Sequence, residues 1–191
     1  MACYSREQLE KIGFAELGED VRISDKASIY GAGNIRIGNH VRIDDFCVLS
    51  AGAGGIDIGN WIHIAVYSSL IGGGRIHLQD FSNISSRVSI YSSTDDFSGE
   101  WMTNPMVPAE FTGVTQADVT VGRHVVVGSG SVILPGVTLE QGVAIGALSL
   151  VKHSCREFSI HAGTPARQIG ERRRDLLERE RAFLASLNRA E

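Results

Sequence analysis

Aliphatic residues recur at every sixth position over most of the chain. The longest unbroken series consists of Val121, Val127, Ile133, Leu139, Ile145 and Val151. Ile23 and Ile29 start the pattern, and three shorter series follow: Ile37, Ile43 and Leu49; Ile58, Ile64 and Leu70; and Leu78, Ile84 and Ile90. A half-buried strand repeats every two residues and an amphipathic helix about every 3.6, so neither explains this spacing. A repeat of six in groups of three predicts an all-β solenoid of triangular coils, in which each side is one short strand.

Small residues at fixed places support the same fold. The residue four positions after the repeated aliphatic one is usually small or β-branched, as Cys47, Ser68, Ser131 and Val137 show, so that it can face inward near a corner. The 22 glycines among 191 residues exceed an average composition, and we expect them at corners, where unusual backbone angles are needed. A coil with three sides takes about 18 residues, which predicts five to six coils.

The repeat occupies residues 21–168 and is flanked by two segments with helical signals. Residues 1–20 form the expected N-terminal cap, in which Ser5 starts a helix that ends at Gly13. Residues 169–191 form the expected C-terminal helix, whose apolar stripe should pack on the solenoid or on a neighbouring subunit. That stripe comprises Leu176, Leu177, Phe183, Leu184 and Leu187.

Composition and charge exclude several classes of protein. A net charge of −4 argues against a broad nucleic-acid interface, and the basic run 172–174 lies in a mixed tail that is typical of a solvated helix. No apolar run approaches the roughly 20 residues of a membrane span, and the first residues lack the pattern of a secretory signal. Three scattered cysteines form no disulfide framework. We therefore expect a cytoplasmic protein without membrane or nucleic-acid partners.

The six-residue repeat stops between residues 90 and 121. This segment contains one of the two tryptophans and two of the four prolines. An interruption of this length in a repeat protein is usually functional. Trp101, Met102 and Phe111 are too apolar for a free loop, so residues 94–117 are predicted to form an ordered arm that lies on a neighbouring subunit.

Several short stretches of the chain resemble the hexapeptide-repeat acyltransferases. They read Ile-Gly-Asn-His-Val-Arg at 37–42, Val-Gly-Arg-His-Val-Val at 121–126 and Leu-Pro-Gly-Val-Thr-Leu at 134–139. The closing segments 145–151 and 162–167 are similar to those of the acyl-CoA-dependent sugar and nucleotide-sugar acyltransferases of this family. The resemblance implies a left-handed parallel β-helix, a homotrimer with active sites between subunits, acetyl-CoA as acyl donor and a nucleotide sugar as acceptor.

The start of the arm departs from the family pattern. Resembling sugar O-acetyltransferases carry a histidine there to deprotonate a hydroxyl, whereas this chain has Asp95. An amine attacks as its neutral form and needs mainly orientation and the removal of one proton, which a carboxylate can provide. The hypothesis is therefore N-acylation of an amino sugar for surface polysaccharide, with Asp95 and then Asp96 as catalytic candidates. O-acylation, a non-catalytic solenoid and a mere turn at Asp95 and Asp96 remain alternatives.

The remaining site candidates divide between acceptor and donor. His63 and Trp101 are the acceptor-binding candidates, although His63 could equally be a surface residue at a corner. The histidines form no trio of metal ligands at suitable positions, so no metal is expected. The resemblance places CoA along the last coils, with a backbone N–H near Ser129 as oxyanion donor and Arg167 on a CoA phosphate. The donor-binding candidates are Gly128, Ser129, Gly146, Ala147, Lys152 and Arg167.

Overall fold

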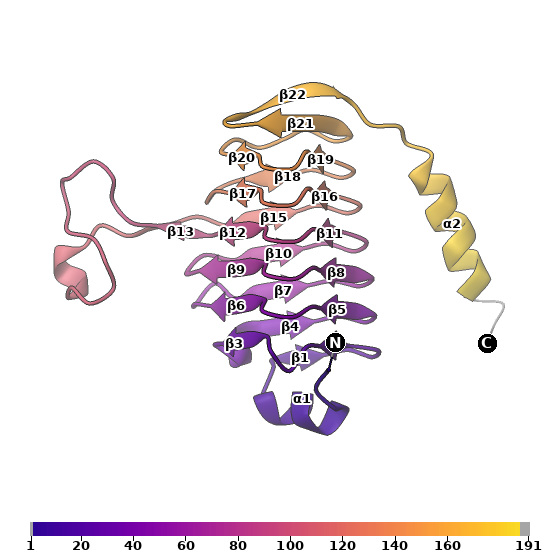
Figure 1. Ribbon diagram of the computed structural model, residues 1–191, viewed down its shortest axis with the longest axis horizontal. Helices are drawn as coiled ribbons and strands as arrows, with labels where there is room; N and C mark the ends of the chain where they lie inside the picture. The colour runs from indigo at the N-terminus through magenta and orange to yellow at the C-terminus, as the bar shows by residue number, and fades with distance from the viewer. Residues whose placement is uncertain (1, 188–191) are drawn as a thin grey trace.

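The chain forms a triangular β-solenoid from which an arm and a helix project in different directions (Figure 1). The computed structural model describes residues 2–187. Three parallel sheets make the sides of the prism. The first contains β1 (Glu16–Leu17), β4 (Ile35–Ile37), β7 (Ile56–Ile58), β10 (Ile76–Leu78), β15 (Val119–Val121) and β18 (Thr138–Leu139). The second contains β2 (Arg22–Ile23), β5 (Val41–Ile43), β8 (Ile62–Ile64), β11 (Asn83–Ile84), β16 (Val126–Val127), β19 (Ala144–Ile145), β21 (Ser159–Gly163) and β22 (Ala166–Glu171). The third contains β3 (Ser28–Tyr30), β6 (Val48–Ala51), β9 (Ser69–Gly72), β12 (Ser89–Tyr91), β17 (Val132–Ile133) and β20 (Leu150–Val151).

Each repeated aliphatic residue lies beside its equivalent in the next coil. Ile58 aligns with Leu78, and Leu78 aligns with Val121 across the insertion. Six strands in the first and third sheets give six complete coils, at the upper end of the predicted five to six, and β21 begins a seventh. The chain then reverses, because β22 pairs with β21 in the antiparallel sense and covers the end of the prism (Figure 1).

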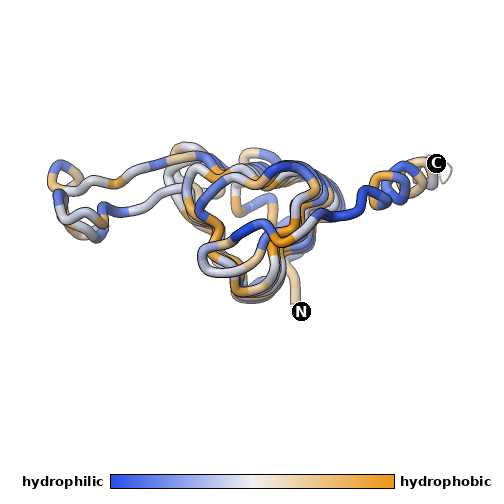
Figure 2. Tube along the Cα trace, turned by 90° about the horizontal axis from the view of Figure 1, so that it is seen from above, coloured by the Kyte–Doolittle hydropathy of each residue, from blue (hydrophilic) through white to orange (hydrophobic). Residues whose placement is uncertain are grey.

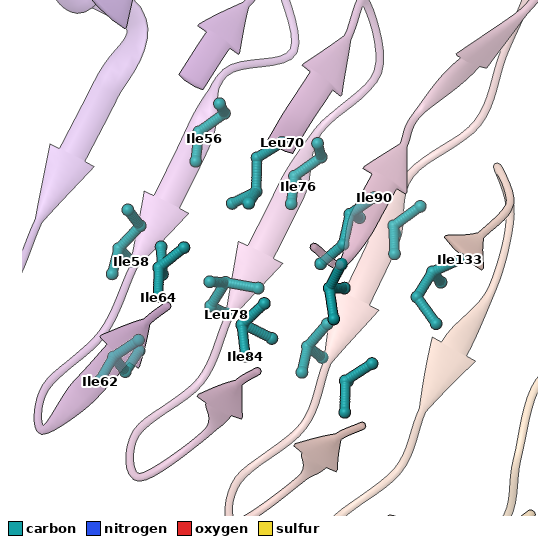
Figure 3. Close-up of a cluster of buried hydrophobic side chains, with 14 of the residues drawn as sticks. Ile56, Ile58, Ile62, Ile64, Leu70, Ile76, Leu78, Ile84, Ile90 and Ile133 are labelled. Carbon is teal, nitrogen blue, oxygen red and sulfur yellow. The ribbon is translucent and has the colours of Figure 1, made fainter. Parts of the chain in front are cut away.

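The core is a stack of aliphatic side chains along the axis of the prism. Figure 3 shows part of this stack, with the residues of successive coils pointing at one another across the interior. Ile43, Ile64, Ile84 and Val127 are completely buried at equivalent positions of successive coils. Burial of such side chains stabilises the fold by about 1.5–3 kcal/mol each relative to exposure. The burial of these residues thus confirms the solenoid core that the six-residue spacing predicts.

The sequence-based expectation that glycines occupy the corners holds only in part. At the corner between the first and second sheets, four successive coils place a bulky residue rather than a glycine in the left-handed region: His40, Trp61, Phe81 and His124, with φ of 57–60°. Gly142 takes this position in the next coil. The four rings form a ladder, in which His40 stacks on Trp61 at 3.7 Å and Phe81 stacks on His124 at 5.0 Å between centroids. Each backbone N–H also donates to a carbonyl of the coil before it. Stacking and these hydrogen bonds offset the strain that glycine would avoid.

Both ends of the prism carry a helix. α1 (Arg6–Ile12) begins at the N-cap Ser5 and ends at Gly13, whose φ of 83° is left-handed, as the sequence predicts. The solenoid starts at β1, before residue 21, and β22 extends past residue 168. The predicted domain boundaries at residues 21 and 168 therefore do not coincide with the ends of the solenoid strands. α2 (Leu176–Leu187) follows a short linker, so helix occupies only part of the segment 169–191, of which 188–191 lie outside the described residues.

α2 returns along the aromatic corner of the prism. Phe183 meets the Trp61 ring edge-on, with the centroids 4.9 Å apart. Glu180 accepts a hydrogen bond from His124 at 2.8 Å and pairs with Arg123. The stripe of α2 therefore packs on the solenoid through Phe183.

The arm leaves the prism after β12 and returns at β15. Its stem is an antiparallel pair of short strands, β13 (Ser93–Thr94) and β14 (Thr115–Gln116). Seen down the prism, the arm and α2 lie on opposite sides of the triangle (Figure 2). The arm occupies the interruption of the repeat, between β12 and β15. Its contact with a neighbouring subunit stays a prediction.

Candidate active site

The root of the arm is bonded to the coil beneath it. The Ser92 hydroxyl is fully buried and donates to the carbonyl of Gly74 at 2.7 Å. The backbone of Ser92 donates to Ile71 and accepts from Ala117, both at 3.0 Å, so that the outgoing and returning chains are joined at this residue. These bonds hold the stem in one place relative to the prism, and the stem leads directly to Asp95.

A hollow of about 640 Å³ lies between the arm and the outer face of the third sheet. Val132 and Leu150 of the last coils line it on the side of the prism, and Phe97 and Val114 line it on the side of the arm. We name it the wall hollow. Its complete lining is Tyr91, Ser93, Thr94, Asp95, Phe97, Val114, Val132, Leu134, Pro135 and Leu150.

A second hollow, of about 650 Å³, lies within the arm itself. We name it the arm hollow, and its lining is Asp95, Asp96, Phe97, Gly99, Trp101, Met102 and Thr103. Asp95 and Phe97 line both hollows. A group bound in either hollow would therefore lie beside the Asp95 side chain.

The two neighbouring aspartates have different environments. Asp95 is exposed at the junction of the hollows. Asp96 closes a turn, because its carboxylate accepts from the Ser98 hydroxyl at 2.7 Å, from the Gly99 N–H at 2.8 Å and from the Trp101 N–H at 3.2 Å. Hydrogen bonds from the side chain and backbone of Ser98 are the main reason why the pKa of Asp96 falls to about 2. This geometry gives Asp96 a structural role in the turn, and Asp95 is the carboxylate that lines both hollows.

Trp101 is placed in the arm hollow, as the acceptor hypothesis requires. Gly113 on the returning strand of the arm packs against the indole, and a Cβ atom at this position would lie 2.5 Å from Cδ1 of Trp101. A side chain at Gly113 would therefore displace the indole from the position in which it lines the hollow.

His63 is not brought to the arm within one chain. It lies on β8 of the second sheet, and neither hollow includes it. Its Nε2 atom lies 2.9 Å from Oδ2 of Asp44. Burial raises the pKa of Asp44, but hydrogen bonds with His63 and Arg42 outweigh it and leave that pKa below its usual value. The interaction fits the surface-residue alternative, and a contact with the acceptor would require the hollow of a neighbouring subunit.

Four of the donor-binding candidates lie in neighbouring coils. A Cβ at Gly128 would approach the backbone N of Ala147 to 2.5 Å, so the two corners touch. The N–H of Leu148 donates to the carbonyl of Ser129 at 2.9 Å. The Gly146 carbonyl accepts from two buried serine hydroxyls. This corner leads into β17 and β20, whose residues Val132 and Leu150 line the wall hollow.

Lys152 and Arg167 lie further toward the C-terminal end of the prism. Lys152 is exposed directly after β20. Arg167 is exposed on β22, and its guanidinium donates to the carbonyl of Ala166 at 3.1 Å. Neither belongs to the lining of the wall hollow, so both cations lie away from its apolar interior.

Sequence reasoning missed the aliphatic residues that line the wall hollow. Val132 and Leu150 precede the buried Ile133 and Val151 and therefore face outward, where Ser69 and Ser89 stand in the aligned strands. The same outward row also contains Val48, away from the arm, so an outward aliphatic residue does not by itself mark the site. Val132 and Leu150 line a hollow because the arm, from a distant part of the chain, lies beside them.

Two further observations concern the described residues 2–187. They contain no group of three or more His, Cys, Asp or Glu side chains placed to hold a metal ion. Over the same residues, neither helix has the length and apolar character that a membrane crossing requires.

Comparison with solved structures assigns the class. AntD, an N-acyltransferase from Bacillus cereus solved with dTDP and 3-hydroxybutyryl-CoA, superimposes with a TM-score of 0.94 at 46% identity, covering 98% of this chain and 100% of AntD. Other AntD structures carry replacements of one aspartate or of one serine. A maltose O-acetyltransferase from Clostridium difficile 630, with a TM-score of 0.59 and 18% identity over 87% of this chain and 74% of its own, shows likeness of fold. The chain is thus a β-solenoid acyltransferase, as the resemblance predicts.

Sequence comparison narrows the assignment. The dTDP-4-amino-4,6-dideoxy-D-glucose acyltransferase of Escherichia coli is 56% identical over 186 residues, which are 97% of each chain. No protein-family model matches the sequence. The chain belongs to the dTDP-4-amino-4,6-dideoxy-D-glucose acyltransferase family.

Proposed function

We propose that this protein transfers a short acyl group from acyl-CoA to the amino group of a dTDP-linked 4-amino-4,6-dideoxy sugar. The observation that carries the proposal is the position of Asp95 between the wall hollow and the arm hollow. Acyl transfer needs a donor and an acceptor that meet at one point, and Asp95 marks that point. The E. coli relative and AntD support the nature of both substrates.

The donor is assigned to the wall hollow and the corner beside it. Small residues at Gly128, Gly146 and Ala147 let the pantetheine chain approach the backbone of the last coils. A backbone N–H near Ser129 would stabilise the oxyanion of the tetrahedral intermediate. Lys152 and Arg167, beyond the hollow, are the cations available for the CoA phosphates. Acetyl-CoA is the simplest donor that this arrangement accepts.

The acceptor is assigned to the arm hollow. Trp101 offers an aromatic face for the sugar or its base. The Asp95 carboxylate binds the ammonium group and orients the amine once it has lost a proton. Asp96 contributes through the turn that shapes the hollow and keeps Trp101 in place.

The reaction follows from these positions. The neutral amine attacks the thioester carbonyl carbon, the C–N bond forms, and the oxyanion is held by backbone N–H donors. When the intermediate collapses, the C–S bond breaks and CoA leaves as its thiolate. The nitrogen gives up one proton, which Asp95 accepts and passes to the departing sulfur, so that amide and CoA thiol are the products.

The assembly and setting form part of the same proposal. The arm carries exposed Phe97 and Met106, each about nine-tenths exposed in one protomer, and a homotrimer would cover them against a neighbouring prism. Cys47 and Cys155 are buried free thiols, which suits the reducing cytoplasm. The use of the product in surface polysaccharide follows the family resemblance.

A thiol-release assay tests the function. The protein is incubated with acetyl-CoA and either dTDP-4-amino-4,6-dideoxyglucose or the analogue with a 4-hydroxyl group, and the products are identified by mass spectrometry. We expect an amide product from the amino sugar and no ester from the hydroxyl analogue. Ester formation alone, or no product from either acceptor with any acyl-CoA, would contradict the proposal.

A further inference from the structure

Acyl transfer needs two substrates that are held on different parts of the chain. The donor-binding candidates Gly128 and Gly146 lie on the last coils of the prism, whereas Trp101 lines the hollow within the arm. Attack requires the amine nitrogen and the thioester carbon to approach to about 3–3.5 Å. The angle between the arm and the prism therefore decides whether the bound substrates can react.

The arm leaves the prism beside a corner made of three glycines, 72–74. Tyr91 of β12 aligns with Ile71 of β9, so the root of the arm follows this corner in the next coil. A Cβ atom at Gly74 would lie 2.9 Å from the carbonyl oxygen of Ser92 and 3.1 Å from that of Ala117, and the first distance is too short for a side chain. Gly74 does not have left-handed backbone angles, so this contact with the arm root is what requires glycine.

Hydrogen bonds hold both chains of the arm root in this contact. On the outgoing side, the Ser92 hydroxyl donates to the Gly74 carbonyl at 2.7 Å. On the returning side, the Asp118 carboxylate accepts from the Arg75 N–H at 2.8 Å. Because the root is fastened on both sides of Gly74, a side chain there would displace the stem that leads to Asp95.

Gly73 has a different neighbour. The three atoms nearest to a Cβ at Gly73 all belong to the side-chain amide of Gln116, at 2.5–2.8 Å. Gln116 is exposed on β14, so its side chain can turn away while the backbone of the stem stays in place. A methyl group at Gly73 should therefore leave the arm where it is.

We propose that Gly74 is a positioning residue, which sets the spacing between the acceptor on the arm and the donor on the prism because it lets the arm root rest directly on the coil below. Asp118 fixes the same contact on the returning chain through its bond to Arg75. The proposal rests on the proposed function and adds residues that line neither hollow and act on the rate of the reaction rather than on binding.

The first test compares Gly74→Ala with Gly73→Ala, using acetyl-CoA and dTDP-4-amino-4,6-dideoxyglucose. We expect kcat of Gly74→Ala to fall by roughly 10–10²-fold, because a misplacement of about 1 Å can cost about 10² in rate. The dissociation constants of CoA and of dTDP, measured by calorimetry, should change little, since each ligand keeps its own surface. Gly73→Ala should keep kcat close to the wild type.

A second pair of variants tests the returning chain without crowding the coil. Asp118→Ala removes the acceptor of the Arg75 N–H and should lower kcat in the same direction by a smaller factor. Asp118→Asn keeps an acceptor oxygen and should retain the wild-type kcat. Asp118 is exposed, so both variants should fold, and this pair decides alone if Gly74→Ala does not fold.

Gly38→Ala is the matched control for crowding, because a Cβ at Gly38 would lie 2.7 Å from the Gly59 carbonyl oxygen at a corner that does not carry the arm. It should lower the thermal midpoint and leave kcat unchanged. A folded Gly74→Ala variant with wild-type kcat, equal losses of kcat in Gly73→Ala and Gly74→Ala, or wild-type kcat in Asp118→Ala would overturn the proposal. Absence of CoA release by the wild-type protein would instead contradict the proposed function.

Discussion

The Ser92 hydroxyl donates to the carbonyl of Gly74 at 2.7 Å and joins the root of the arm to the coil below it. Ser92 is fully buried, and Asp95 follows three residues later. We expect Ser92→Ala to leave the Gly74 carbonyl without this donor and to lower the free energy of unfolding by about 1–3 kcal/mol. Because the stem also loses its fixed position, kcat/KM for acyl transfer should fall.

Denaturant unfolding and steady-state kinetics measure these two effects. Ser69→Ala is the control, since the Ser69 side chain lies in the outward row of the third sheet and its hydroxyl donates to the Ser89 hydroxyl at 3.2 Å. An unchanged kcat/KM in Ser92→Ala would show that the arm root holds Asp95 without this bond.

Asp95→Asn keeps the size of the side chain and removes its ability to accept a proton. We expect kcat/KM for the amino sugar to fall by roughly 10²–10⁴, the range for a positioned acid or base. The dissociation constant of acyl-CoA, measured by calorimetry, should change little. Near-full activity would assign Asp95 to the turn and leave catalysis to orientation of the amine.

Asp96 is expected to affect the pH dependence of the arm's structure and not the chemical step. Its pKa of about 2 lies below the ordinary value of about 3.9, because hydrogen bonds from Ser98 favour the carboxylate. The turn is therefore fully stabilised above about pH 4, and this stabilisation is lost as the pH falls toward 2. NMR titration of the Gly99 and Trp101 amides should report this step near pH 2, and Asp96→Asn should abolish it. A titration of these amides near pH 4 would contradict the bonded geometry.

Arg167→Ala tests the contact with a CoA phosphate. Loss of a charge-assisted hydrogen bond should raise KM for acetyl-CoA by about tenfold or more while kcat stays close to wild type. A dephospho-CoA thioester should be affected less than acetyl-CoA if Arg167 meets the 3′-phosphate. Arg173→Ala is the control, because Arg173 is exposed and pairs with Asp175 in the linker. Equal losses with both thioesters would exclude this phosphate as the partner of Arg167.

Phe183→Ala tests the attachment of α2 to the solenoid. The edge-on contact of Phe183 with Trp61 should contribute about 0.5–1.5 kcal/mol beyond the apolar area that it buries. We expect a lower thermal midpoint and an altered Trp61 emission, measured in a Trp101→Phe background so that Trp61 is the single fluorophore. Acyl transfer with Trp101 intact should remain at the wild-type level, because α2 lies on the opposite side of the prism from the arm (Figure 2). An unchanged emission would mean that α2 does not rest on Trp61 in solution.

The six-residue repeat alone predicted the solenoid, because every coil must bury the same kind of side chain at the same place. Ile64 and Val127 are buried at equivalent positions although 63 residues separate them in the chain. The helix from Ser5 to Gly13 was equally predictable, since its capping signals are local. The interruption of the repeat after Ile90 indicated the arm. Asp95 became the candidate carboxylate because it stands where resembling O-acetyltransferases carry a histidine.

Contacts between distant segments decided the rest. The sequence ranked Asp95 before Asp96 by resemblance only. The physical difference between them appears in the fold, where the turn directs the donors of Ser98 and Gly99 to the Asp96 carboxylate and leaves Asp95 at the boundary of both hollows. The sequence could not give Val132 and Leu150 a function, because outward aliphatic residues form a pocket only when Val114 of the arm stands opposite them. It also predicted glycines at corners where His40 and Trp61 stand, since the stacking that offsets their strain joins side chains 21 residues apart.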